Sequence, residues 1–374
     1  MLKKCWISSV KLATVMVNEY ALHKARELAN SVRFSDDQHD KALGSQPASL
    51  DHVMDEFYRS AVEISPLLTP TLETSLINVC QRLNLDRHVV HAFVHNSSEL
   101  QAACYYTDEI KCLIRISSAL VNLLKEDQLE FVIAHEIGHF LLQHAPSGTS
   151  KKSVEFFIFQ RAKEISADRI GLIGCGSLKL AADTLIKVAS GLHDKFLDIK
   201  IDAYLAQMSQ ITNKSGGERP FETHPSMLVR AFSLNEFSDG HQFVNYDTFN
   251  VKQVYNKDII IKNYLDEFVD KKTKEDITNA KIDLEMWIAA RHIAEDGRFD
   301  QHEQTLFSQK FGETLLQKLK VFLQTTQVDQ ITAELDERIA GTKLRLQALS
   351  PAEFSRIEPL IISDMAKKFG RNID

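Results

Sequence analysis

The sequence lacks any long run of apolar residues. No stretch of its 374 residues approaches the roughly 18 consecutive apolar residues that cross a bilayer as a helix, so we expect no transmembrane segment. The start of the chain, MLKKCWISSV, is basic, but Lys11 interrupts the apolar segment and no small-residue cleavage site follows it. We therefore interpret this start as part of the mature chain and not as a signal peptide.

Cysteine is scarce as well. The chain has five cysteines, an odd number, and no two of them form a C-x-x-C pair: Cys5, Cys80, Cys104, Cys112 and Cys175. This scatter argues against a disulfide framework and a cysteine zinc site, so we expect a reducing compartment, the cytoplasm. In GLIGCGSLK, Lys179 stands where a G-x-G-x-x-G phosphate loop needs its last glycine, so we interpret Cys175 as a buried thiol.

Concentrated positive charge is also absent. Lysine and arginine number 44 against 51 aspartate and glutamate residues, which gives a net charge of −7, and no basic run is longer than a pair such as Lys151-Lys152. We therefore expect no nucleic-acid partner. What remains is an ordinary globular composition, 44% apolar and 25% charged, in a chain long enough for two or three domains.

Hydrophobic periodicity places a small sheet early in the chain. Residues 1–60 have amphipathic helical patterns that a polar loop at residues 33–52 interrupts. Apolar residues recur at helical spacing in residues 71–85, and strand patterns follow at residues 88–95, 100–106 and 109–117. In the last of these, apolar and polar residues alternate, which predicts a strand with one face mostly in water.

The rest of the chain has helical patterns. They cover residues 118 to about 210 and everything beyond about 250, while residues 212–226 are rich in Gly, Ser and Pro and predict a loop. The fold class is therefore α+β and mainly helical, with a small sheet ahead of the central helices. We expect an N-terminal helical segment at 1–60, a central domain at 61–240 and a helical C-terminal domain at 250–374.

The stretch AHEIGH, residues 134–139, contains two histidines four positions apart. Four residues turn a helix by about 400°, so His135 and His139 lie on one face and can hold one metal ion. Glu136 can accept a proton from a water on that metal without binding the metal itself. The alternative is a helix with two structural histidines, because H-E-x-x-H also arises by chance in a chain with 14 histidines.

An apolar stripe over residues 129–141 supports the helix. We expect Asp127 and Glu130 to form a capping box at its start. Pro146 and Gly148 are expected to end it.

A catalytic zinc needs a third protein ligand. The pattern H-E-x-x-H-x-x-G-x-x-H fails, because Leu142 and Ala145 occupy its glycine and last histidine positions, and His144, out of register by one, is assigned no ligand role. The segment QRAKEISADRIG supplies Glu164 and Asp168 four positions apart on a second predicted helix. Glu164 can bind the metal, and Asp168 can orient a ligand histidine through its other ring nitrogen.

Three segments, LEFVIAHEIGHFLLQH, KEISADRIGL and THPSMLVR, resemble in order and content the gluzincin metalloendopeptidases of metallopeptidase family forty-eight, which include the heat-shock protease HtpX and the CaaX prenyl protease. The similarity covers about residues 65–240. It implies a zincin-type peptidase core with one zinc ion, whose ligands are His135, His139 and Glu164. It implies Glu136 as general base and Asp168 as a residue that orients a zinc ligand. It also implies His224 and Arg230 as hydrogen-bond donors that stabilise the oxyanion.

The resemblance also implies how a peptide substrate binds, as an added strand at a sheet edge. The segment HAFVH, residues 91–95, lies where similar enzymes carry Asn-Ala-Phe and that edge, with His91 in place of the Asn. Only 25 positions separate His139 from Glu164, which leaves little room for a lid between the two metal helices.

In the C-terminal part, HIAEDGRFDQHE at residues 292–303 weakly resembles the TerB-like class. We interpret this domain as a module that binds a partner protein or regulates the enzyme; the alternative is a packing domain with no site. For the whole chain, the hypothesis is a zinc-dependent metalloendopeptidase of protein substrates. The alternative is a catalytically weak, zinc-stabilised peptide-binding or chaperone-like protein.

Overall fold

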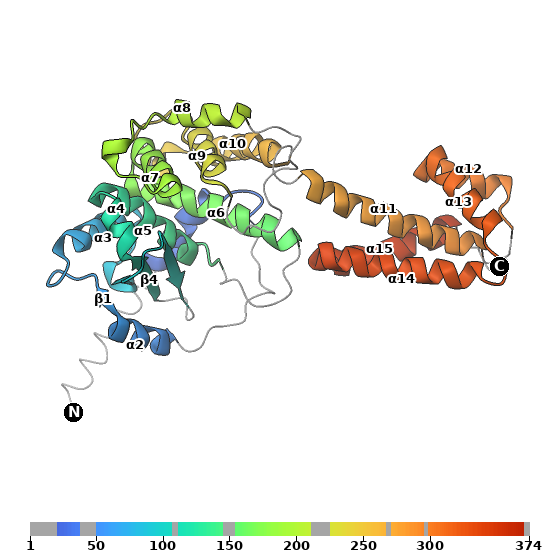
Figure 1. The fold of residues 1–374 in the computed structure, drawn as a ribbon, viewed down its shortest axis with the longest axis horizontal. Helices are drawn as coiled ribbons and strands as arrows, with labels where there is room; N and C mark the ends of the chain where they lie inside the picture. Colours follow the sequence, from blue (N-terminus) through green and yellow to red (C-terminus); the bar gives the residue numbers. More distant parts are fainter. Residues whose placement is uncertain are drawn as a thin grey trace. The chain divides into compact units, whose positions relative to one another are not determined.

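The computed structural model describes residues 21–37, 50–106, 111–144, 154–210, 225–266, 271–294 and 298–369 (Figure 1). The predicted α+β, mainly helical class is confirmed. Contacts divide the chain into two compact units, and the main part of the first ends at Leu265 while that of the second begins at Asp266. Within the described ranges, no helix is both long and apolar enough to cross a membrane.

The first unit contains one mixed sheet of four strands, in the order β1-β2-β4-β3. Strands β2 (Val90–His95) and β4 (Cys112–Ser117) are parallel, and β1 (Ala61–Glu63) and β3 (Ala102–Tyr105) add to their outer sides in the antiparallel direction. The three predicted strands are confirmed in this way. Strand β1 was not predicted, because three residues are too few to show a period.

The prediction that β4 has one face mostly in water is wrong. Leu113 is fully buried and packs in a cluster with Leu50, Phe57 and Phe93, so helix α2 (Leu50–Ser60) contributes to the cover of that face. Arg115 is half-buried, and its guanidinium lies 5.6 Å from the centre of the Phe57 ring. A helix more than fifty residues earlier thus covers a face whose alternation alone indicated exposure.

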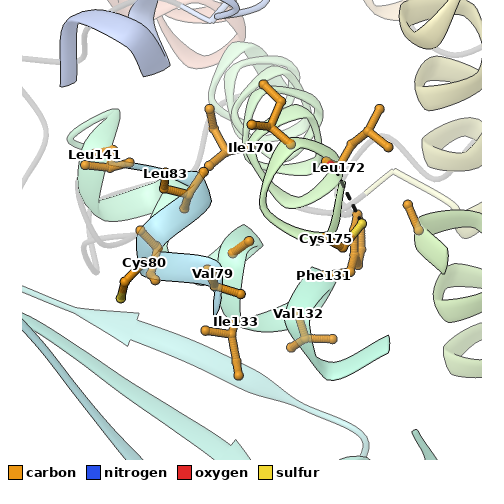
Figure 2. Close-up of a cluster of buried hydrophobic side chains, with 14 of the residues drawn as sticks. Val79, Cys80, Leu83, Phe131, Val132, Ile133, Leu141, Ile170, Leu172 and Cys175 are labelled. Atoms are coloured by element: carbon orange, nitrogen blue, oxygen red, sulfur yellow. Dashed lines mark hydrogen bonds between the residues drawn. The ribbon is translucent and has the colours of Figure 1, made fainter. Parts of the chain in front are cut away.

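Three helices form the main core of the first unit with the sheet: α3 (Pro70–Arg82), α5 (Glu126–Leu141) and α6 (Val154–Cys175). Figure 2 shows their apolar side chains in contact, with Val79 from α3, Ile133 and Leu141 from α5, and Ile170 and Cys175 from α6. Burial of such side chains contributes about 1.5–3 kcal/mol each to folding. Both helices that carry the predicted ligands, α5 and α6, are therefore core elements.

The predicted capping box of α5 is wrong. The helix begins at Glu126, one residue before the expected cap, and Gln128 Oε1 accepts a hydrogen bond of 3.1 Å from the backbone N–H of Lys125. Glu130 instead pairs with Arg82 and accepts a bond of 2.9 Å from Asn78. The residues expected to end the helix, Pro146 and Gly148, lie outside the described residues.

Further helices of the first unit are α4 (Ser118–Leu123), α7 (Leu178–Ser190), α8 (Ile201–Leu205), α9 (Met227–Ser238) and α10 (Val251–Tyr264), with an additional helix over residues 21–31. Short 3-10 turns occur at Arg87–Val89, Asp194–Phe196, Ala206–Gln210 and Tyr246–Thr248. Helix α7 packs on α5 and α9, and α10 packs on α9. Residues Val251–Tyr264, which were expected in the C-terminal domain, thus belong to the first unit.

The second unit is helical, as expected. Its helices are α11 (Lys271–Ile293), α12 (Gln301–Phe311), α13 (Glu313–Thr325), α14 (Ile331–Leu349) and α15 (Pro351–Phe369). Helix α11 packs along α14 and α15 (Figure 1), around a core that includes Leu284, Leu335, Leu346 and Met365. This unit therefore has an apolar core of its own.

Small residues set the distance between α5 and α6. A Cβ atom added to Gly138 of α5 would lie 3.0 Å from the Cβ of Ile170 and 3.2 Å from the Cα of Ala167 on α6. A Cβ added to Gly174 of α6 would overlap the Cβ of Ala134 on α5. Any larger side chain at these glycines must push the two helices apart.

We expect Gly174→Ala to destabilise the protein by about 1–3 kcal/mol, because the added methyl group overlaps Ala134 in a packed core. The free energy of unfolding, measured by urea denaturation, checks this. The matched control is Gly341→Ala on α14, where an added Cβ has no neighbour within 4 Å, so the change should be neutral or slightly stabilising. Equal stability of the Gly174→Ala variant and the parent would contradict the steric argument.

Candidate metal centre

The two core helices bring the three predicted ligands together. Helix α5 presents His135 and His139, and α6 presents Glu164. The two Nε2 atoms are 3.2 Å apart. Glu164 Oε2 lies 3.4 Å from His135 Nε2, and Glu164 Oε1 lies 3.5 Å from His139 Nε2. The ligand atoms of these three residues all lie within 4.8 Å of one another.

These separations can be compared with those of a metal site. Two ligands at about 2.0–2.1 Å from a tetrahedral zinc ion lie about 3.3 Å apart. The observed 3.2–3.5 Å between His135, His139 and Glu164 matches that spacing. Two imidazoles and one carboxylate are donors that suit a divalent transition metal. The residues present therefore fit one such ion.

His135 is oriented by the carboxylate of Asp168, whose Oδ1 lies 3.0 Å from His135 Nδ1. An ionised carboxylate only accepts hydrogen bonds, so Nδ1 carries a proton, and Nε2 is the ring nitrogen that faces Glu164 and His139. Burial would lower the pKa of His135, but its bonds to Asp168 and Glu164 raise that pKa to about 9. A cation that binds Nε2 must therefore displace a proton.

Arg230, from α9, holds Asp168 in place. Its Nε donates a bond of 2.7 Å to Asp168 Oδ2, and its Nη2 donates to Oδ1. Burial would raise the pKa of Asp168, but the Arg230 guanidinium and His135 hold it below its ordinary value. Because Asp168 is fully buried, this two-pronged contact keeps its charge compensated and its oxygen aimed at His135.

His139 is oriented differently, by a residue to which the sequence analysis gave no ligand role. His139 Nδ1 lies 2.8 Å from Nδ1 of His144, and His144 Nε2 lies 2.9 Å from Asp37 Oδ2. His144 is not among the three residues whose ligand atoms converge. Burial lowers the pKa of its ring, although Asp37 acts in the opposite direction.

Sequence reasoning missed Asp37 entirely. It lies 107 residues before His144, in a stretch whose polar composition predicted a loop. His144 left a weak signal, because it follows the end of α5 so closely. Gln143 adopts a left-handed conformation with φ of 56°, and the His144 N–H donates to the His139 carbonyl at 2.9 Å. This turn folds His144 back onto His139.

Glu136 is 7% exposed and lines the same cavity as His135, Glu164 and Arg230. Burial raises the pKa of the Glu136 carboxyl to about 7. A carboxylate that titrates near neutral pH can both accept and return a proton under ordinary conditions. The arrangement thus places a group capable of general acid–base chemistry beside the three converging ligands.

The cavity has a volume of about 330 Å³. Away from the ionisable groups its wall is mostly apolar, with Leu100, Leu120, Phe131, Val132, Leu185, Val188 and Met227. Gln101 and Ala102, at the start of strand β3, also line it. An apolar side chain of a ligand therefore fits next to the predicted metal position.

The remaining predictions have different outcomes. His224 lies outside the described residues. The sheet edge expected at HAFVH is wrong, because β2 lies between β1 and β4, and the edge strand beside the cavity is β3. Cys175 is buried, as predicted, and burial raises its pKa to about 12, so its thiol is inert.

We expect Glu164→Gln to lose the metal, because a neutral amide is a poor third ligand for a cation held by two imidazoles. Zinc retained per chain after dialysis, measured by elemental mass spectrometry, checks this. Glu130→Gln is the matched control, since Glu130 is equally buried and pairs with Arg82 away from the site. Full zinc retention by Glu164→Gln would show that the carboxylate is not a ligand.

The comparison with known families agrees with the geometry. Residues 66–159 match the family model described as Peptidase family M48. The search of curated proteins and the search of solved structures each gave no match. The matched segment contains His135, Glu136 and His139, while Glu164 follows five residues after its end. The segment that carries the histidine pair is thus similar to peptidase family M48, and the match supports that family for this part of the chain.

Proposed function

We propose that the protein is a zinc-dependent endopeptidase that hydrolyses peptide bonds of protein substrates. One observation carries the proposal: the Nε2 atoms of two histidines and the Glu164 carboxylate converge at 3.2–3.5 Å beside a cavity that Glu136 also lines. Two imidazoles and a glutamate are a ligand set that would hold a catalytic zinc ion and still let it act on a water. The match of residues 66–159 to a peptidase family supports the same reaction class.

When bound, zinc would supply Lewis acidity that polarises the scissile carbonyl and acidifies a water. Glu136 accepts the proton of that water and returns it to the leaving amine. A pKa of about 7 suits this double task, because the carboxylate is a base before the attack and an acid after it. Glu136 follows His135 by about 100° around α5, so its carboxylate can reach the cavity without binding the metal.

Arg230 and His224 are proposed to stabilise the oxyanion of the intermediate. Two nitrogens of Arg230 hold Asp168, while Nη1 lies 4.0 Å from Glu164 Oε2 and 3.8 Å from Met227 Sδ. Arg230 also lines the cavity, so we assign Nη1 to the carbonyl oxygen of the substrate. The role of His224 rests on the resemblance of the H-P-x-x-x-x-R segment.

The substrate is proposed to bind as an extended strand along β3. Among the strands that the structure describes, β3 pairs only with β4, and the residues at its start line the cavity. Backbone hydrogen bonds to an edge strand provide affinity without regard to sequence, and a side-chain pocket provides choice. The apolar cavity then selects for a substrate with an apolar side chain next to the scissile bond.

The alternative, a zinc-stabilised peptide-binding or chaperone-like protein, is not favoured. A protein that only binds peptides has no use for a buried glutamate whose pKa lies near 7 beside the ligands. We propose action in a reducing compartment, the cytoplasm, since the four described cysteines are free thiols. The C-terminal helices, TerB-like by resemblance, are proposed to bind a partner protein.

We expect Glu136→Gln to retain zinc but to lose about 10²–10⁴-fold in kcat/KM, because the amide cannot accept the proton of the water. Cleavage of a fluorescently quenched unfolded protein measures the loss, and elemental analysis measures the zinc. Glu130→Gln should retain full activity. Equal inactivity of the parent and Glu136→Gln, with zinc bound to both, would favour the peptide-binding alternative.

Val188→Phe should shift substrate preference towards smaller side chains, because the larger ring fills part of the apolar cavity. We expect kcat/KM for peptides with a large apolar residue to fall about 10–200-fold relative to peptides with alanine at the same place. Cleavage-site profiling of a peptide library by mass spectrometry checks this. The control is Leu192→Phe, at an exposed position after α7. An unchanged cleavage profile for Val188→Phe would show that this cavity does not select the substrate side chain.

A further inference from the structure

The two ligand histidines have different groups behind them. His135 Nδ1 faces a carboxylate directly, at 3.0 Å from Asp168. His139 Nδ1 faces a second imidazole, that of His144, at 2.8 Å, and the carboxylate of Asp37 stands behind that second ring at 2.9 Å. Both His144 and Asp37 are buried, at 5% and 4% exposure. A buried chain of three groups thus leads from Asp37 to the metal position.

The position of each proton in this chain follows from what each atom can do. The Asp37 carboxylate only accepts, so His144 Nε2 carries a proton and donates it. In a neutral imidazole the other nitrogen, His144 Nδ1, then has a lone pair and must accept. The donor to it is His139 Nδ1, and the lone pair of His139 lies on Nε2, the atom that faces His135 and Glu164.

The segment just before Asp37 is bonded to three helices. The Phe34 N–H donates to Ser166 Oγ at 3.1 Å, and the Ser35 N–H donates to Asp258 Oδ2 at 2.9 Å. Arg33 donates to the Leu142 carbonyl at 2.5 Å and lies 3.5 Å from Asp37 Oδ1. These bonds tie the segment that carries Asp37 to the end of α5, to α6 and to α10.

We propose that His144 and Asp37 are positioning residues that set the proton of His139 and so present its Nε2 lone pair to the metal. The inference rests on the proposed metal site, but it concerns affinity for the ion and not the cleavage step. Neither residue touches substrate. Without this chain, His139 can carry its proton on Nε2, and binding the metal must then first remove that proton.

The test measures zinc affinity by competition with a chromophoric chelator, at one pH, for the full-length protein. His144→Phe keeps a buried ring but cannot accept the His139 proton, and we expect its zinc affinity to fall about 10–100-fold. His144→Gln keeps an acceptor and a donor, so it should recover affinity to within about threefold of the parent. His95→Phe is the matched control, because His95 is equally buried but its ring bonds the Ile116 carbonyl, and its zinc affinity should stay unchanged.

Asp37→Leu tests the far end of the chain. It removes the acceptor with little change in shape, so zinc affinity should again fall. Because Asp37 acts through His144, the double variant His144→Phe/Asp37→Leu should bind zinc no more weakly than His144→Phe alone. Two independent packing defects would instead multiply their effects, and that result would overturn the proposal.

Circular dichroism and thermal unfolding of the variants without added metal report on folding. If His144→Phe fails to fold, the decision passes to Asp37→Leu and His144→Gln. Folded variants His144→Phe and Asp37→Leu that bind zinc as tightly as the parent would also overturn the inference. A parent protein that binds no zinc would instead refute the proposed function, so the two failures can be told apart.

Discussion

The contact between α5 and α6 is the constraint on which the site depends. Two of the predicted ligands come from one helix and the third from the other, so the distance between the helices sets the distance between these three side chains. Gly138 and Gly174 permit an approach that a single added methyl group would prevent. Apolar side chains of the same two helices pack in one core, as Figure 2 shows. The same packing of α5 against α6 therefore determines both the core and the geometry of the site.

The negative charge of the buried carboxylates also favours a bound cation. Glu136, Glu164 and Asp168 are all buried, and the guanidinium of Arg230 lies among them. The carboxylates raise the pKa of His135 to about 9, so without a bound ion its imidazolium compensates part of their negative charge. Three buried carboxylates are expensive to bring together, and a divalent ion between His135, His139 and Glu164 would compensate their charge in place of that proton. The electrostatics of the cluster therefore favour the same ion as its geometry.

The sequence predicted what depends on local periodicity. The pairs His135/His139 and Glu164/Asp168 could be assigned because a helix converts a spacing of four into a shared face. The cover of β4 by α2 and the contact between His144 and Asp37 depend on residues far apart in the chain, which no local pattern reveals. The predicted cap of α5 was wrong for another reason, because Glu130 forms an ion pair with Arg82. In each case the prediction was wrong because of a contact with a residue far away in the sequence.

The same reasoning changes the meaning of residues 33–37. Their polar composition indicated a loop, and they make no regular element, yet they bond the end of α5, Ser166 on α6 and Asp258 on α10. Arg169 of α6 extends this network, with its guanidinium bonded to Asp258 and packed 5.2 Å from the centre of the Phe34 ring. One short segment therefore bonds both helices that carry the predicted ligands, and it places the Asp37 carboxylate against His144. Asp37 precedes the family match by about thirty residues, so the motif alone does not define every residue around the site.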